Sequence, residues 1–219
     1  MDKRKIAASV LIALGIGIMG IPAYYKYQGA NETDRLLDSF EKTLEVAEDE
    51  KMEQKGKDKK PSTGCQEKPA ISEENDMEDG AIGIVEIEKL GIRYPIVEGT
   101  SVSDLRYAIG HMSDSAGIGE RGNCIICGHN GSRYGEYFTN LSKVEVGDRV
   151  TVTDRDGDIY KYEIDEAYKT SPKDRRITEH SDEKMLTLFT CADSGKNRFV
   201  VKCSLVADSV QRGGDVNDI

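Results

Sequence analysis

Three side chains in the C-terminal half of the chain have the types that cysteine-based acyl transfer requires. Cys191 ends the apolar run LTLFT and is followed at once by the turn-like ADSGKN. A thiol at a strand end can meet a substrate while its backbone is held rigidly, as a nucleophile requires. His129 also follows a buried run, in CIICGHNG. Neighbouring strands lie about 4.8 Å apart, so two such strand ends would bring the thiol and the imidazole together.

Arg198 begins the next apolar run, seven residues after Cys191. It lies on the strand face opposite Phe199 and Val201, from which a guanidinium could reach a developing oxyanion beside the thiol. The alternative is an arginine that is simply solvated on a strand face. Of the other two histidines, His111 is either structural or lines a groove, and His180 lies in a polar loop where we expect it to be solvated.

The remaining cysteines are better explained as structural. Cys203 alternates in phase with the apolar residues of its strand, which indicates a core position. Cys124 and Cys127 form a C-x-x-C pair, but no second ligand pair follows, as zinc would require. On a strand their Cα atoms would lie about 10 Å apart, too far for a disulfide. Cys65 lies in a charged segment, and the total of five leaves at least one without an intrachain partner.

The elements that would position these residues are short strands. Alternating or apolar runs between 81 and 206 are separated by turns rich in Gly, Asp and Pro, and Pro95 indicates an edge or a bend. The predicted strands cover 81–90, 92–99, 123–128, a hairpin over 146–164 with its turn at Asp156-Gly157, 184–190 and 198–206. A short helix is expected within 101–108. This pattern predicts a mainly β fold, a closed or nearly closed β-barrel with short helices.

The N-terminal segment has the length and flanks of a membrane anchor. Residues 6–25 are uncharged and mostly apolar, and about 20 such residues can cross a bilayer as a helix. Lys3, Arg4 and Lys5 precede this stretch, which predicts a single-pass protein with a cytoplasmic N-terminus and an extracellular barrel. A cleaved signal peptide is the alternative, although its apolar stretch is usually shorter.

A charged spacer is expected between the anchor and the barrel. Leu36, Leu37, Phe40, Leu44 and Ala47 have helical spacing, with Asn31 as the expected N-cap, whereas 51–80 has no apolar period. We therefore expect a partly helical stalk that holds the barrel clear of the membrane. The predicted organisation is an anchor over 1–28, a spacer over 29–80, a catalytic barrel over 81–207 and a flexible tail over 208–219.

Composition narrows the classes of partner. Hydrophobic residues make up 37% of the chain and charged residues 32%, so part of it is expected to lie outside a core. The net charge of −10 repels phosphate backbones, so no nucleic-acid partner is expected. The spacing of the acidic residues matches no calcium-binding loop, and we expect no required metal or cofactor.

The barrel segments resemble the sortases of Gram-positive bacteria over about residues 81–206. The resemblance lies in GIVEIEKLGIRYPIVEG, NCIICGHNG, TLFTC and NRFVVKCSLV, which follow one another in this order. TLFTC is similar to the family's T-L-x-T-C signature, His129 occupies the family's strand-end G-H, and Arg198 follows the cysteine as expected. This resemblance implies a β-barrel cysteine transpeptidase that cleaves an L-P-x-T-G-like sorting signal after Thr.

The resemblance also implies roles and partners. Cys191 would form a thioacyl intermediate, His129 would act as general acid and then base, and Arg198 would stabilise the oxyanion. The partners would be surface proteins that carry a sorting signal, an amine of a cell-wall precursor, and the membrane. The short loop before the cysteine strand favours a class D-like enzyme, with class B next and a pilin-polymerising enzyme as an alternative. The alternative hypotheses are a wall transpeptidase of the L,D type and a non-catalytic binding module on the same barrel.

Overall fold

The computed structural model describes residues 3–54 and 80–206. Within the N-terminal helix it describes the side chains of residues 15 and 18–46. The predicted spacer from 55 to 79, with Cys65, and the predicted tail from 208 to 219 lie outside the described residues.

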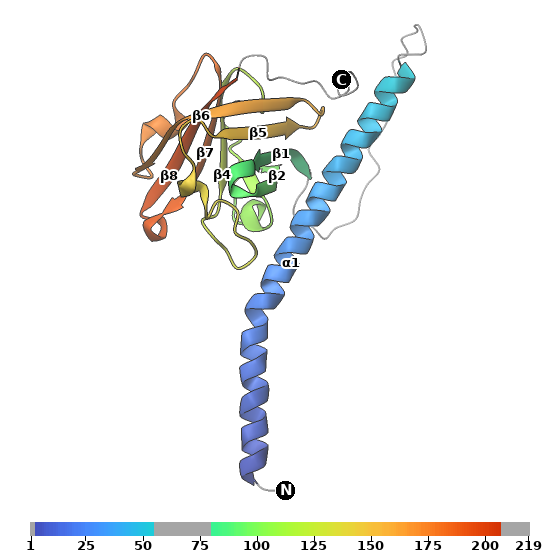
Figure 1. Cartoon of the computed structure of the whole chain (residues 1–219), viewed down its shortest axis with the longest axis vertical. Helices are drawn as coiled ribbons and strands as arrows, with labels where there is room; N and C mark the ends of the chain where they lie inside the picture. Colours follow the sequence, from blue (N-terminus) through green and yellow to red (C-terminus); the bar gives the residue numbers. More distant parts are fainter. Residues whose placement is uncertain (1–2, 55–79, 207–219) are drawn as a thin grey trace.

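Eight strands form the C-terminal part of the chain (Figure 1). They are β1 (Ala81–Ile87), β2 (Ile92–Glu98), β3 (Ile109–His111), β4 (Gly122–Gly128), β5 (Arg149–Asp154), β6 (Ile159–Thr170), β7 (Lys184–Ala192) and β8 (Asn197–Leu205). Their order around the barrel is β1-β2-β3-β4-β7-β8-β6-β5, and pairing of β1 with β5 closes it. The predicted closed barrel is therefore confirmed.

The strand pairing brings together the strand ends that carry His129, Cys191 and Arg198. The pairs β2–β3 and β4–β7 are parallel, and the other neighbours are antiparallel. Because β4 and β7 run in the same direction, their C-terminal ends lie at the same rim of the barrel. The strand β8 starts at that rim, because it is antiparallel to β7.

Several strand boundaries differ from the sequence prediction. β3 was not expected, since its three residues are too few to produce an alternating pattern. β1 ends at Ile87, because a 3-10 turn over Glu88–Leu90 closes on Gly91 in the left-handed region (φ 61°). β2 lies between two neighbours, but β3 pairs with it only from Ile96 onward, so Pro95 has a neighbouring strand on one side only.

The barrel interior is a single apolar core. Its largest fully buried side chains include Phe138, Tyr162, Ile126 and Leu188. Cys203 lies in this core, as its alternation with the apolar residues of its strand predicted, and so does Cys124. Burial of these side chains is the main favourable contribution to the stability of the barrel, at about 25 cal/mol per Å².

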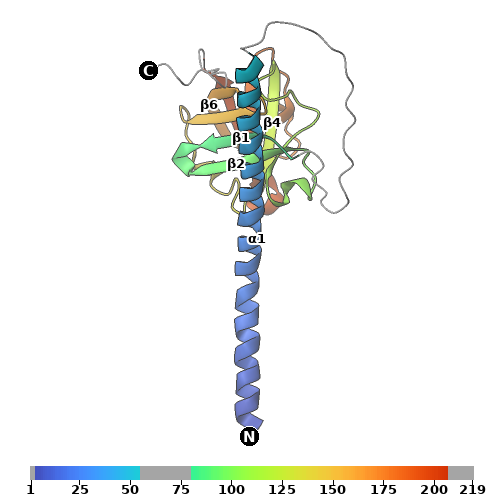
Figure 2. The ribbon, with the colours of Figure 1, turned by 90° about the vertical axis from the view of Figure 1, so that its right-hand side faces the viewer.

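One helix, α1 (Lys3–Gln54), precedes the barrel and runs through the predicted boundary at residues 28 and 29 without interruption. Asn31 lies inside this helix, so its prediction as an N-cap was wrong. The C-terminal half of α1 lies along the barrel beside β1 and β2, and the N-terminal half extends beyond it (Figures 1 and 2). Part of the expected helical spacer, through Leu44, packs on the barrel.

The packed face of α1 is a narrow stripe with helical spacing. Its buried members are Gly29, Thr33, Leu36, Leu37 and Phe40. Leu37 and Phe40 pack with Ala81 and Ile84 of β1, which anchors the helix on the barrel. Over residues 30–45 the helix surface outside this stripe is mostly polar, as expected for a helix that covers one side of a domain.

No helix in the described part of the chain has the length and hydropathy expected of a membrane span. The expected anchor at residues 6–25 falls largely on positions whose side chains lie outside the described ones.

Candidate active site

Cys191 lies at the exposed end of β7. Leu186 and Leu188 of the same strand point into the core, so Phe189 and Cys191 point to the outer face of the barrel. The Cys191 side chain is free and exposed to solvent. This combination of a rigid backbone and an accessible thiol is what the sequence predicted.

The turn after Cys191 is held in an unusual conformation. Asp193 and Ser194 both have positive φ angles, 49° and 56°, which are rare for residues other than glycine. The carboxylate of Asp193 accepts a hydrogen bond from Asn197 Nδ2 at 2.6 Å and lies 3.0 Å from Lys169 Nζ. These two partners lower the pKa of Asp193. The turn that joins β7 to β8 is thereby fixed immediately beside the thiol.

Arg198 is the direct partner of Cys191 in the β7–β8 ladder. Opposite residues in an antiparallel pair project to the same face, with Cβ atoms about 4.5–5.5 Å apart. Its Nη1 donates to the carbonyl oxygens of Gly195 (3.1 Å) and Asn197 (3.0 Å), which holds the guanidinium over the turn. Within the described residues, Nε and Nη2 have no protein acceptor and can serve a ligand.

His129 follows the last residue of β4, and Cys191 follows Thr190 of β7. The parallel register pairs Gly128 with Thr190, so one further residue along each chain places His129 beside Cys191. The imidazole is half-buried, with its ring centroid 6.2 Å from that of Tyr137. Asn130 Nδ2 donates to the carbonyl oxygen of Cys191 at 2.7 Å, which ties the two strand ends together.

The eight residues Asn130–Tyr137, which we call the histidine loop, leave His129 and return to it. A β-bridge joins Asn130 to Tyr137, and Phe138 N donates to His129 O at 3.0 Å. Tyr137 has a positive φ of 44° and is held by two hydrogen bonds. Its hydroxyl donates to Arg106 O at 2.5 Å, and its backbone N–H donates to the Tyr94 hydroxyl oxygen at 3.2 Å. The base of the loop is therefore fixed on the barrel.

Cys127 lies beneath the site on the same outer face of β4, and its thiol is buried. Burial, with a smaller contribution from the nearby Cys191, raises its pKa to about 11, and Arg198 acts in the opposite direction. Burial also raises the pKa of Cys124 to about 12 and that of Cys203 further. All four described cysteines are free, so the C-x-x-C pair is not a disulfide, and Cys191 is the only accessible thiol among the described residues.

A loop between β6 and β7 borders the same outer face. It carries a 3-10 turn over Arg175–Thr178, and Asn123 of β4 tethers it. Asn123 Nδ2 donates to the carbonyl oxygens of Ile177 (3.3 Å) and Glu179 (3.0 Å), and Asn123 Oδ1 accepts from the Thr187 hydroxyl at 2.7 Å. This buried amide fixes one side of the surface that carries Cys191.

The other two histidines lie apart from this group. His111 is buried in β3, with Nδ1 2.9 Å from Glu98 Oε2 and Nε2 2.9 Å from the Ala116 carbonyl oxygen, so it is structural. His180 is exposed, 3.8 Å from Asp182. Among the described residues, no three His, Cys, Asp or Glu side chains gather as a metal site would require. The absence of a required metal stays a prediction.

Comparison with known proteins shows which family contains this chain. The family model "Sortase domain" matches residues 85–206, more than half of the chain. The chain belongs to the sortase family. Sortases are cysteine transpeptidases, and a thiol, an imidazole and a guanidinium at one barrel rim suit that chemistry.

Relatives resemble this sortase over most of their length. Sortase D of Bacillus subtilis is 28% identical over 86% of this chain and 89% of its own length. Sortase A of Bacillus anthracis is 21% identical over 97% of this chain and 100% of its own length. Among solved structures, a Clostridium perfringens sortase D5 transpeptidase is 32% identical, with a TM-score of 0.61, over 80% of this chain and 98% of its own.

Sequence reasoning missed several residues that build the site of this sortase. Asn130, Tyr94 and Tyr137 carry no motif of their own, and their contacts depend on how distant segments meet. Only Asn130 offered a signal, because it directly follows His129. Tyr25 of α1 packs against Tyr134 of the histidine loop, and this contact was also missed, since it requires knowing which face of the helix meets which loop.

Proposed function

We propose that this sortase cleaves an L-P-x-T-G-like sorting signal after Thr and transfers the protein to an amine of the cell wall. The supporting observation is the convergence of Cys191, His129 and Arg198 at one rim, at the ends of three adjacent strands. The three differ in chemistry as a transpeptidase requires: a nucleophile, a proton carrier and a fixed positive charge.

In the first half-reaction, the Cys191 thiolate attacks the carbonyl carbon of the substrate Thr. The carbonyl oxygen becomes an oxyanion, which Arg198 stabilises with a guanidinium held over the turn by its Nη1 contacts. The C–N bond then breaks, and His129 donates a proton to the departing Gly amine. The product is a thioester between Cys191 and the Thr carbonyl.

In the second half-reaction, an amine of the cell-wall precursor attacks the thioester carbonyl. His129, now neutral, accepts the proton that the amine loses, and the tetrahedral intermediate again places its negative charge beside Arg198. Collapse expels the Cys191 thiolate and restores the enzyme. Water competes with the amine at this step, so transfer requires a surface that favours the amine.

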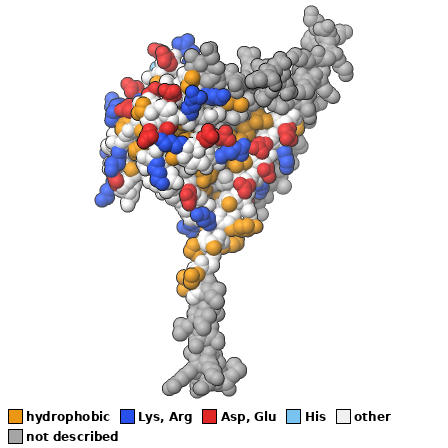
Figure 3. Space-filling view, in the orientation of Figure 1, with side chains coloured by type: hydrophobic (Ala, Val, Ile, Leu, Met, Phe, Trp, Pro, Cys, Tyr) orange, Lys and Arg blue, Asp and Glu red, His pale blue; other side chains and the backbone are white. Residues whose placement is uncertain are grey.

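We also propose that the N-terminal end of α1 anchors the enzyme in the membrane, with the barrel outside the cell. Ile18, Met19 and Ile21 are 67%, 81% and 54% exposed, and Tyr24 and Tyr27 are exposed beside them. These side chains gather where α1 leaves the barrel (Figure 3). Exposed aliphatic side chains followed by tyrosines are typical of the membrane interface. Recovery of the full chain in the membrane fraction, with the barrel digested by protease added to intact protoplasts, would support this topology.

Class D is the assignment that we favour. The similarity to two sortases named D supports it, as does the loop between β6 and β7, whose described structure holds only a short 3-10 turn. We propose that catalysis requires no metal or cofactor, because the three groups above supply the nucleophile, the proton carrier and the charge stabilisation.

The proposed activity is tested with the full chain in detergent and a fluorogenic sorting peptide. Cleavage without added amine, and formation of an amine-linked product with added glycine peptide, are expected. Addition of a chelator should leave both rates unchanged. If the protein binds the peptide but neither cleaves nor transfers it, the chain is a non-catalytic binding module and the proposal is wrong.

A further inference from the structure

The tip of the histidine loop touches α1 through backbone atoms. Gly29 is buried in the helix stripe, and a β-carbon at this position would overlap the carbonyl oxygen of Tyr134 and lie 2.6 Å from its carbonyl carbon. No side chain fits between the helix and the loop there. Glycine is less favourable than alanine inside a helix, so its place at this contact reflects the close approach of the two backbones.

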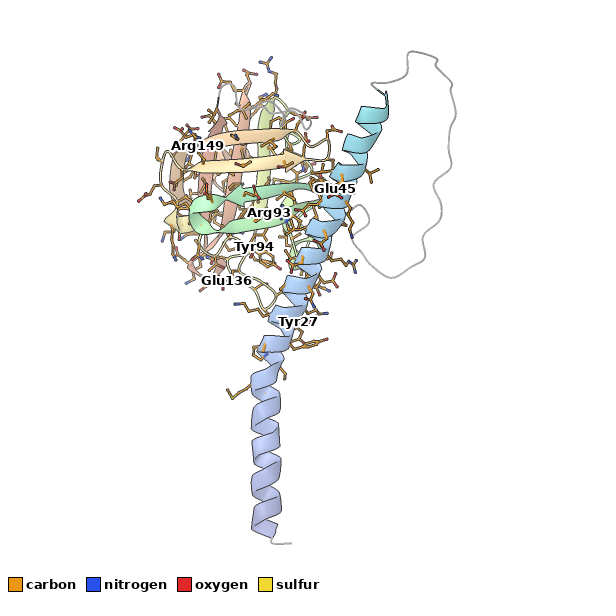
Figure 4. The ribbon with its side chains drawn as sticks, turned by 45° about the vertical axis from the view of Figure 1, so that its right-hand side comes forward. Tyr27, Glu45, Arg93, Tyr94, Glu136 and Arg149 are labelled. Atoms are coloured by element: carbon orange, nitrogen blue, oxygen red, sulfur yellow. The ribbon has the colours of Figure 1, made fainter. Side chains whose placement is uncertain are left out.

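Aromatic and charged side chains surround this backbone contact. The ring of Tyr134 packs edge-on against Tyr25 of α1 at 5.6 Å between centroids, and against Tyr107 at 5.1 Å. The Arg133 guanidinium lies 5.2 Å from the centre of the Tyr25 ring, a cation–π distance. Lys26 of α1 lies 3.3 Å from Glu136, which faces the helix in Figure 4.

The loop transmits the position of its tip to His129. Its ends are tied by the Asn130–Tyr137 bridge, and Phe138 N bonds to His129 O. Asn130, the first residue of the loop, also donates to the backbone of Cys191. A shift of the tip therefore strains two hydrogen bonds, Phe138 N to His129 O and Asn130 Nδ2 to Cys191 O. These bonds set the position of the imidazole relative to the thiol.

This contact is separate from the one that holds α1 on the barrel. Leu37 and Phe40 pack on β1, two or three helical turns further along α1, and Thr33 donates to Tyr107 O at 2.7 Å. Loss of the Gly29–Tyr134 contact would therefore leave the main attachment of the helix in place.

We propose that α1 buttresses the histidine loop, and that Gly29 and Tyr134 are positioning residues for His129. This inference rests on the proposed function, because it concerns the placement of the general acid and base. Docking of the helix restricts the loop and so holds the imidazole at one place beside the thiol. Misplacement of a catalytic group by about 1 Å can reduce turnover by about 100-fold.

The test uses the full chain in detergent and two matched substitutions in one helix. Gly29→Ala puts a methyl group against the loop, whereas Gly20→Ala adds the same methyl where no atom lies within 4 Å. Both substitutions replace a helical glycine by alanine, so the intrinsic gain in helix propensity is of the same kind in both. We expect Gly29→Ala to lower kcat by about 10- to 100-fold with KM changed by less than about twofold, and Gly20→Ala to match the wild type.

A second pair of variants tests the ring of Tyr134, which packs on α1 beside the backbone contact. Tyr134→Phe keeps the ring that packs on Tyr25 and should retain the wild-type kcat, whereas Tyr134→Ala should lose it as Gly29→Ala does. Because the chain has three histidines, the side-chain resonances of His129 can be assigned by substitution. We expect those resonances to shift or broaden in Gly29→Ala and Tyr134→Ala, and to stay unchanged in Gly20→Ala and Tyr134→Phe.

The outcomes separate this inference from the proposed function. A wild-type protein that neither cleaves nor transfers the peptide overturns the proposed function itself. If the wild type is active and both Gly29→Ala and Tyr134→Ala keep the wild-type kcat, the buttress alone is overturned. A fall in kcat that accompanies a lower melting temperature of the barrel, with the resonances of His129 unchanged, also overturns it, because the contact is then merely stabilising.

Discussion

Cys191 and Arg198 face each other directly across the β7–β8 ladder, on either side of a turn with two left-handed non-glycine residues. The guanidinium is held by two carbonyl oxygens of that turn. The positive charge is therefore fixed on the turn that follows Cys191 before any substrate arrives. Such preorganisation is what makes electrostatic stabilisation of an oxyanion effective.

Arg198→Lys should lower kcat by about 100-fold while KM changes by less than about threefold. An ammonium keeps the charge but cannot hold the turn carbonyls and a ligand with one planar group. Steady-state kinetics on the sorting peptide measure the two parameters. Lys202→Arg, on the same face of β8 but opposite Thr187, is the control. A large rise in KM with an unchanged kcat would show that Arg198 binds substrate and does not stabilise the oxyanion.

Thiol reagents should modify Cys191 before the three buried cysteines of the barrel. At pH 8, a thiol with a pKa of about 11, as for Cys127, is ionised to only about one part in a thousand, and its burial blocks access. Iodoacetamide treatment followed by peptide mapping gives the order of modification. Faster labelling of Cys127 or Cys124 than of Cys191 would contradict the assigned accessibilities.

Much of this fold follows from local sequence pattern, and the reasons are physical. Alternation identified the long strands, and the apolar runs that end near His129 and Cys191 located both proposed reactive residues. The three-residue β3 was not detectable, because it is too short to show a period. The spacing of Leu36, Leu37 and Phe40 indicated a helix but could not reveal that its apolar stripe covers β1.

Contacts between distant segments account for the rest. The spacing of Leu36, Leu37 and Phe40 is the same in an isolated helix and in a docked one, so the sequence could not show which surface the stripe covers. The sequence alone offered no indication of the contact at Gly29, since a single glycine inside a helix indicates only lower helix stability. Its role becomes visible only when the Tyr134 backbone is placed against it.

Asn123→Ala should lower the free energy of unfolding by about 2 kcal/mol, because it leaves the Thr187 hydroxyl and two loop carbonyls without their buried partner. Urea denaturation measures this difference. Asn140→Ala is the control, because the Asn140 side chain makes no capping hydrogen bond to its 3-10 turn. Equal unfolding free energies in the two variants would mean that the buried amide does not hold the loop.

The carboxylate of Asp174 should make the loop between β6 and β7 sensitive to acid. Hydrogen bonds from Arg176 and Thr170 hold the pKa of Asp174 well below its usual range. A pKa lowered by folding adds stability above the unfolded value, and this stability is lost as the pH falls toward the folded value. Asp174→Asn should therefore lower the melting temperature at pH 7, and this difference should shrink between about pH 5 and pH 3.

Asp182→Asn is the matched control for that pH series, since the side chain of Asp182 is 97% exposed. Its melting temperature should follow that of the wild type at every pH. A difference between Asp174→Asn and the wild type that stays constant down to pH 3 would show that ionisation of Asp174 is not the cause.

The most direct test of the central claim is the mass of the intact protein after brief incubation with a sorting peptide. The wild type and Cys127→Ala should both gain the mass of the peptide fragment that ends in Thr, as a thioester that hydroxylamine removes. Cys191→Ala should gain nothing, because Cys191 is the accessible thiol at the barrel rim. A hydroxylamine-sensitive adduct on Cys191→Ala would contradict the assignment of Cys191 as the nucleophile.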